Sequence, residues 1–126
     1  MKRKKSLKKI YIDVNVLYYY LTAHRTYGKK AKEFIEFYSG ILATSCLTPW
    51  LLYVLTRLEQ IDEILTDIGI QLLPLTQEIL EKARKLSKPK DYEDRIHLAT
   101  MIKNNINIII SNDSDFDKIP NITRIF

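Results

Sequence analysis

Short apolar runs rich in β-branched residues alternate along this chain with longer segments of helical periodicity. Four of the short runs predict buried parallel strands, at residues 10–14, 41–45, 70–73 and 106–110. A fifth run, residues 123–126, predicts a strand at the sheet edge. Because the first four runs are short, largely apolar and rich in β-branched residues, we expect helices to cover both faces of the sheet.

Helical spacing between these runs predicts four helices, over residues 29–38, 49–58, 76–86 and 92–103. The segment 49–58 is apolar nearly all round, so we expect it to be buried or to lie in an interface. Strands that alternate with helices are typical of right-handed βαβ units. The pattern therefore predicts an α/β fold, a three-layer α/β/α sandwich with a mainly parallel sheet of about four to five strands.

Length and charge limit the organisation and the partners. A chain of 126 residues fits one domain, which we place at residues 10–126 behind a basic tail at residues 1–9. The net charge of +5 and a pI of about 9.3 favour a polyanionic partner, without choosing between RNA, DNA and an acidic protein. The tail itself could contact nucleic acid or serve only solubility.

The sequence also predicts where the protein works. Its single cysteine, Cys46, can form no internal disulfide, which favours a reducing compartment. The basic start is not followed by the apolar run of a signal peptide, because Asp13 and Asn15 interrupt it. No stretch reaches the roughly 18 apolar residues of a membrane helix. We therefore expect a cytoplasmic protein with no membrane partner.

Several polar residues follow predicted strands, where open α/β sheets bind their ligands. Asp13 and Asn15 follow the first strand, and Asp113 and Asp115 follow the strand that ends at residue 110. Asp94 lies near the start of the helix before that strand. We expect these side chains to meet at one edge of the sheet, although Asp13 and Asn15 could simply end a strand and begin a turn.

Clustered carboxylates repel each other, and a hard divalent cation relieves that repulsion. Mg²⁺ or Mn²⁺ prefers oxygen ligands and keeps several waters. A water bound to the metal deprotonates more easily, and the metal stabilises charge on a phosphate. The acids therefore predict phosphodiester hydrolysis without a histidine or cysteine ligand.

Some of these acids also have a purely structural interpretation. Asp91 and Asp94 stand three residues apart at a helix start, as a capping pair would. Asp113 and Asp115 could cap the short segment 116–119. We expect His97, one turn after Asp94, to support the sheet rather than to act in catalysis.

Four segments, in order, resemble motifs of the PIN domain family: YIDVNVLY (residues 11–18), TSCLTPW (44–50), DRIHLAT (94–100) and SNDSDF (111–116). The chain looks most like the toxin half of VapBC toxin–antitoxin modules, which are ribonucleases of this size. That resemblance implies an RNA substrate, a cognate antitoxin and Mg²⁺ or Mn²⁺. The implied catalytic and metal-binding acids are Asp13, Asp94 and Asp113, with Asn15, Asp115 and Ser111 as accessory residues.

The second acid of the family pattern is missing. Many relatives read Thr-Ser-x-Leu-Thr-x-Trp-Glu-Leu-Tyr, and Leu51 stands here at the glutamate position. Glu59 lies eight residues on, about 12 Å along a helix, which is too far to substitute. We expect impaired ribonuclease activity, and the alternative is a catalytically silent PIN fold that binds RNA or a protein partner. A phosphatase or receiver domain fits less well, because Asp13 to Asn15 lacks the second acid of a phosphatase nucleophile motif.

Aromatic and aliphatic side chains predict an assembly. Trp50, Leu52 and Val54 leave the helix from residue 49 too little polar surface for solvent, and Tyr18 to Tyr20 form a packed aromatic face. We expect one of these surfaces to be buried in a symmetric homodimer.

Overall fold

The structure is a computed structural model that describes residues 8–126, and a parallel five-stranded sheet forms the centre of that part. The strands are β1 (Ile10–Ile12), β2 (Leu42–Ser45), β3 (Ile70–Leu73), β4 (Ile108–Ile110) and β5 (Thr123–Ile125). The helices are α1 (Val14–Leu21), α2 (Gly28–Phe37), α3 (Leu47–Thr56), α4 (Ile61–Asp67), α5 (Gln77–Lys85) and α6 (Tyr92–Lys103). Of the predicted tail, only Lys8 and Lys9 lie within the described residues.

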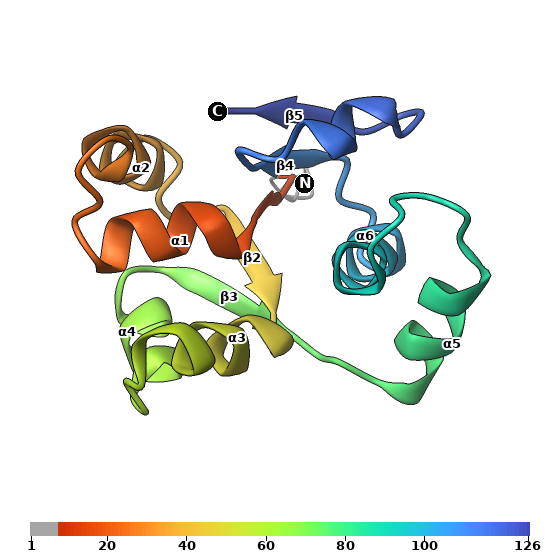
Figure 1. Cartoon of the computed structure of the whole chain (residues 1–126), viewed down its shortest axis with the longest axis horizontal. Coiled ribbons are helices and arrows are strands. Elements are labelled where there is room, and N and C mark those ends of the chain that lie inside the picture. The colour runs from red at the N-terminus through yellow and green to blue at the C-terminus, as the bar shows by residue number, and fades with distance from the viewer. Residues whose placement is uncertain (1–7) are drawn as a thin grey trace, which may run out of the picture.

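Helices cover both faces of the sheet, which confirms the predicted three-layer sandwich. Helices α1 to α4 lie on one face, and α5 and α6 lie on the other (Figure 1). Strand β1 contributes side chains to the cores on both faces of the sheet, because successive side chains of a strand point to opposite faces. Ile10 and Ile12 belong to the core under α1 to α4, and Tyr11 belongs to the core that contains Met101 of α6.

The strand order β3-β2-β1-β4-β5 puts the first strand at the centre of the sheet. The chain moves outward from β1 to β2 and β3, then crosses to β4 on the other side of β1. This reversal creates a topological switch point between β1 and β4, where open α/β sheets bind ligands. Ile12 pairs with Ile110, so Asp13 and Ser111 leave the sheet side by side.

Helices α1 and α4 were not among the four predicted helices, and several element ends differ from the predictions by one or two residues. Val14 was expected to end the first strand but begins α1, because the Asp13 carboxylate accepts a hydrogen bond from the Val14 backbone N–H at 2.7 Å. For α1, the sequence predicted only that Tyr18 to Tyr20 form a packed aromatic face, and gave no helix boundaries. Helix α4 was not predicted, since only Ile61 and Leu65 of its seven residues are buried.

The described helices are short. The longest, α6, has 12 residues. None of them, within residues 8–126, is long and apolar enough to cross a membrane.

Candidate functional site

A hollow of about 230 Å³ opens at the switch point, and we call it the acidic hollow. It is lined by Asp13, Val14, Asn15, Tyr18, Leu55, Glu93, Asp94 and Asp113. Four of these side chains are carboxylates, and none of the described lining residues is a lysine or an arginine. At about 30 Å³ per water molecule, the volume holds a hydrated cation.

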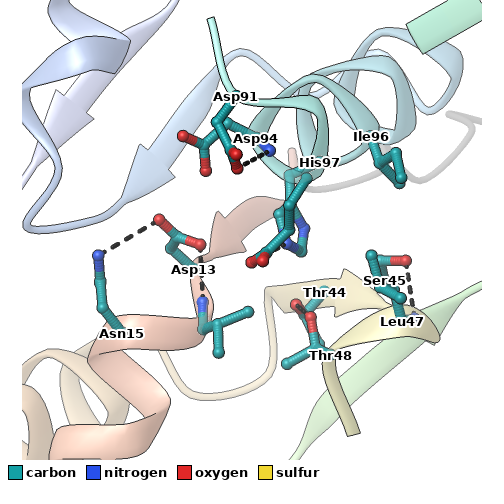
Figure 2. Close-up of polar contacts among 12 residues, drawn as sticks. Asp13, Asn15, Thr44, Ser45, Leu47, Thr48, Asp91, Asp94, Ile96 and His97 are labelled. Carbon is teal, nitrogen blue, oxygen red and sulfur yellow. Dashed lines mark hydrogen bonds and ion pairs between the residues drawn. The ribbon is translucent and has the colours of Figure 1, made fainter. Parts of the chain in front are cut away.

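Asp13 is the most buried of these acids, with 4% of its surface exposed. One carboxylate oxygen accepts the Val14 N–H, and the other accepts the Ser111 hydroxyl at 2.7 Å. Asn15 donates to the same second oxygen at 3.5 Å, a long contact (Figure 2). Burial raises the pKa of Asp13 above its ordinary value in spite of these donors. The side chain is therefore held rigidly in a place that disfavours its charge.

Ser111 and Asn15 join the ends of β1 and β4. Besides donating to Asp13, the Ser111 hydroxyl accepts the backbone N–H of Asp113 at 3.0 Å. The Asn15 side-chain oxygen accepts the backbone N–H of Asn112 at 3.3 Å. Two of the three residues that the sequence assigned as accessory thus tie the Asp13 side chain to the loop that carries Asp113.

Asp94 enters the acidic hollow from the first turn of α6. Its backbone N–H donates to the Asp91 carboxylate at 3.4 Å, so Asp91 is the capping residue and the Asp94 side chain is free (Figure 2). Burial raises the pKa of Asp94 to about 7, and the negative charges of Asp13, Asp113 and Asp91 add to that effect. Carboxylates that face one another and raise each other's pKa in this way repel, and a bound cation would relieve that repulsion.

Three carboxylates come closest together: one oxygen each from Asp94, Asp113 and Asp115 lie within 4.8 Å of one another. In octahedral coordination at ~2.0–2.1 Å, neighbouring oxygen ligands of one Mg²⁺ stand about 2.9 Å apart and opposite ones about 4.2 Å, so the three carboxylates would have to close by up to about 2 Å to share an ion. The donor set, made only of carboxylate oxygens, fits a hard divalent cation. Asp115 also makes an ion pair with Lys118 at 3.6 Å.

The sequence grouped the acids slightly differently. It placed Asp13, Asp94 and Asp113 on one ion, with Asp115 as an accessory residue. In the structure Asp115 belongs to the closest group, and Asp13 borders the same hollow from a buried position. Asp113 also caps the 3₁₀ helix η1 (Ser114–Lys118), because its carboxylate accepts the Asp115 N–H at 2.9 Å.

Arg124 of β5 holds the loop that carries Asp113. Its guanidinium donates two hydrogen bonds to Asp117, at 2.9 and 3.0 Å, and one to the Ser111 carbonyl at 2.9 Å. The paired guanidinium lowers the pKa of Asp117. This bidentate contact fixes η1 against the sheet, and with it the position of Asp113.

The α3 side of the acidic hollow is apolar. Leu51 is half-buried and packs against the core under α1 to α4, and Leu55, one turn later, lines the hollow. Helix α3, with the sequence LTPWLLYVLT, contains no acid. The structure therefore offers no carboxylate from α3 in place of the missing glutamate.

Glu93 is the lining acid that the sequence reading missed. It lies next to Asp94 in α6 and four residues before His97, a spacing that places Glu93 and His97 on one helix face. That spacing was the available signal. His97 is fully buried, and its ring meets the Tyr11 ring edge-on at 5.6 Å between centroids, as expected of a structural residue.

Comparisons with known proteins identify the family and the fold. The model of the PIN domain family matches residues 10–122. A toxin–antitoxin complex from Klebsiella pneumoniae contains a similar chain, with a TM-score of 0.72 and 24% identity, covering 91% of this chain and 96% of that one. VapC20 of Mycobacterium tuberculosis, described as a sarcin–ricin loop cleaving toxin, has a TM-score of 0.67 and 18% identity over 86% of this chain and 93% of that one.

A third similar structure is VapBC2 from Rickettsia felis bound to a DNA fragment from its promoter. Its TM-score is 0.63 and its identity 15%, over 92% of this chain and 96% of that one. At these identities the three structures support the fold. No curated protein sequence matches the chain.

Proposed function

Because the chain belongs to the PIN domain family, we propose that it is a divalent-metal-dependent endoribonuclease of the VapC toxin type. The observation that carries the proposal is the meeting of Asp94, Asp113 and Asp115 within 4.8 Å at the switch point of the sheet. The acidic hollow has no lysine or arginine among its described lining residues, and the ion pair of Asp115 with Lys118 lies at an exposed position, so the cluster is suited to hold Mg²⁺ or Mn²⁺.

The acids at the switch point, and the polar residues that hold them, would have distinct tasks. Asp94, Asp113 and Asp115 would hold the ion, which supplies an activated water and stabilises charge on the scissile phosphate. Asp13 faces the same space, and Ser111 and Asn15 keep its carboxylate in one orientation. Since the pKa of Asp94 is raised to about 7, its proton competes with the cation, and Asp94 would bind metal as the carboxylate.

The proposed partners are an RNA substrate and a cognate antitoxin. The net charge of +5 favours a polyanion, and VapC20 is described as a toxin that cleaves the sarcin–ricin loop. Two of the similar structures are toxin–antitoxin assemblies, which supports an antitoxin partner. A cytoplasmic setting and a homodimer belong to the same proposal.

The test is cleavage of RNA by the purified chain in Mn²⁺. We expect activity that EDTA abolishes and that Asp113→Asn lowers at least about 100-fold, because a metal ligand is lost. Asparagine retains the ability to cap η1, so the fold should survive. Asp67→Asn, an exposed site at the end of α4, is the matched control. Cleavage that persists in EDTA or in Asp113→Asn would contradict the proposal.

The absence of an acid from α3 supports a second candidate, a catalytically silent PIN fold that binds RNA or a protein partner. Leu51→Glu distinguishes the two functions. If Leu51 impairs the site, the variant should cleave RNA faster than the unaltered chain, and Asp13→Asn should remove that gain. Metal binding without cleavage by either chain would favour the silent fold.

A further inference from the structure

One buried side-chain polar atom among residues 8–126 has no hydrogen-bond partner: Nε2 of His97. The His97 side chain is 0% exposed, so bulk solvent does not reach this nitrogen. An unpaired buried donor costs about 1–3 kcal/mol, and such an atom in a folded protein calls for a specific reason. The reason lies in what this nitrogen faces.

The other nitrogen fixes the ring. Nδ1 of His97 lies 2.5 Å from the Tyr11 hydroxyl, and that hydroxyl oxygen accepts the Ser45 backbone N–H at 3.1 Å. We assign the hydroxyl proton to the bond with Nδ1, which places the hydrogen of the neutral imidazole on Nε2, because a neutral ring has one protonated nitrogen. In this tautomer His97 presents an N–H donor at Nε2.

That donor points toward Glu93. Nε2 of His97 lies 3.6 Å from a carboxylate oxygen of Glu93, one turn earlier in α6. Glu93 is itself 43% exposed in its side chain and lines the acidic hollow next to Asp94. A movement of less than about 1 Å would complete the hydrogen bond. Figure 2 shows His97 and Asp94 on α6, and Asp13 where β1 meets α1.

We propose that Glu93 is a further carboxylate of the metal centre, oriented by His97, and that it supplies from α6 the acid that α3 lacks. The inference rests on the proposed function, since it assigns a residue to the same site. Glu93 would act on the ion directly or through one of the waters that Mg²⁺ and Mn²⁺ retain. His97 is then a positioning residue, which holds a ligand as an outer hydrogen-bond partner does in other metal sites.

The other acids nearby are committed elsewhere. Glu59 lies beyond the end of α3 and lines a separate hollow with Pro49, Trp50 and Tyr53. The Asp91 carboxylate caps α6. Glu93 is thus the acid that lines the acidic hollow without being among the site residues predicted from sequence. It lines the hollow from α6, whereas Leu55 lines it from α3.

Calorimetric titration of the purified chain with Mn²⁺ tests the assignment without relying on catalysis. We expect one site in the unaltered chain, a dissociation constant 10- to 100-fold higher in Glu93→Gln, and no measurable site in Asp113→Asn. Glu36→Gln, at an exposed position of α2, is the matched control and should bind as the unaltered chain does. Glu93 is half-exposed, so its variant should fold.

A double-mutant cycle tests the positioning role. His97→Gln should weaken Mn²⁺ binding in the unaltered background but cause no further loss in Glu93→Gln. A merely structural histidine would weaken binding equally in both backgrounds, which would overturn that role. Equal affinities of Glu93→Gln and Glu36→Gln, with binding lost only in Asp113→Asn, would overturn the assignment of Glu93 and leave the proposed function standing. No Mn²⁺ binding by the unaltered chain would overturn both.

Discussion

The carboxyl group of Asp94 illustrates how a single residue in the acidic hollow opposes folding when no metal is bound. Its pKa is raised to about 7, mainly by burial, against an ordinary value of 3.8. A folded-state pKa above the unfolded value means that ionisation destabilises the fold. The loss begins as the pH rises above 3.8 and is complete above about 7.

Asp94→Asn should therefore stabilise the metal-free protein at pH 8. The full shift of roughly three units would correspond to about 4 kcal/mol, and screening at a half-exposed group reduces this to about 1–2 kcal/mol. Urea unfolding at pH 8 and at pH 4.5 in EDTA measures the difference. The gain should shrink at the lower pH, where the wild-type carboxyl is already protonated; an equal gain at both pH values would contradict the electrostatic cause.

Tyr11 offers the second prediction for a single side chain. Its buried hydroxyl contacts His97 of α6 and the Ser45 backbone of β2, so it joins three elements. Tyr11→Phe would leave two buried polar groups unpaired and should lower the free energy of unfolding by about 1–3 kcal/mol. Tyr20→Phe is the control, since no hydrogen bond of its hydroxyl is found within the described residues, and it should change stability by less than about 0.5 kcal/mol. Similar losses in both variants would contradict this account.

The residue-level prediction from sequence depended on position relative to the strands. Asp13 and Asp113 could be assigned because Asp13 comes directly after the apolar residues 10–12 and Asp113 lies three residues after the strand that ends at residue 110, and parallel strands end at one edge of a sheet. The place of Asp115 in the closest group of carboxylates could not be predicted from sequence, because it depends on how η1 turns after Asp113. The proposed role of Glu93 could not be predicted either, since it depends on the rotation of α6 that buries His97.

At the level of elements, α6 is anchored to its neighbours by Arg95. The guanidinium donates to the carbonyls of Ala83 at 3.0 Å, Pro89 at 3.1 Å and Lys90 at 2.6 Å. Ala83 belongs to α5, and the other two residues belong to the loop that leads into α6. Arg95 thus fixes the approach to the first turn of α6, which carries Glu93 and Asp94.

Arg95→Met should keep the length of the side chain but lose these donors. We expect a decrease of about 1.5–3 kcal/mol in the free energy of unfolding, because charged donors to buried carbonyls are strong. Amide exchange in residues 86–91 should also become faster, since the loop loses its ties. Arg84→Met, at an exposed position of α5, is the control. Unchanged exchange in the loop of Arg95→Met would contradict the proposed anchor.

The element pattern was predictable where apolar periodicity is strong. The runs at residues 70–73 and 92–103 coincide with β3 and α6 as observed. The boundary between β1 and α1 could not be predicted, because Val14 continues the apolar run in the sequence, whereas the Asp13 cap starts a helix there in the structure. Helix α4 was not predicted, because a helix of seven residues with two buried positions shows too little apolar periodicity in the sequence.

For the whole molecule, the distribution of exposed apolar side chains bears on assembly. Trp50, Val54, Leu55 and Leu58 form what we call the α3 patch, with exposed fractions of 59%, 47%, 59% and 47%. Trp50, Val54 and Leu58 recur every four residues. Tyr18, Tyr19 and Tyr20, the other surface expected to pair, are partly buried against the core. The α3 patch is therefore the better candidate for a contact between two copies.

A dimer contact through the α3 patch would affect the acidic hollow, because Leu55 belongs to the patch and also lines the hollow. A symmetric dimer through this patch would narrow the hollow and cover its apolar wall. Val54→Lys places a charge in the centre of the patch, on a side chain that does not line the hollow.

We expect the unaltered chain, of 14.9 kDa, to show the mass of a dimer by light scattering at micromolar concentration. Val54→Lys should shift the mass toward the monomer and raise the dissociation constant at least about tenfold, since a buried unpaired charge is costly at an interface. Phe37→Lys is the matched control: Phe37 is 80% exposed on α2, outside the α3 patch, and its variant should remain dimeric. A monomeric mass for the unaltered chain would rule out the homodimer. A dimer that survives Val54→Lys but dissociates in Phe37→Lys would place the contact on α2 instead.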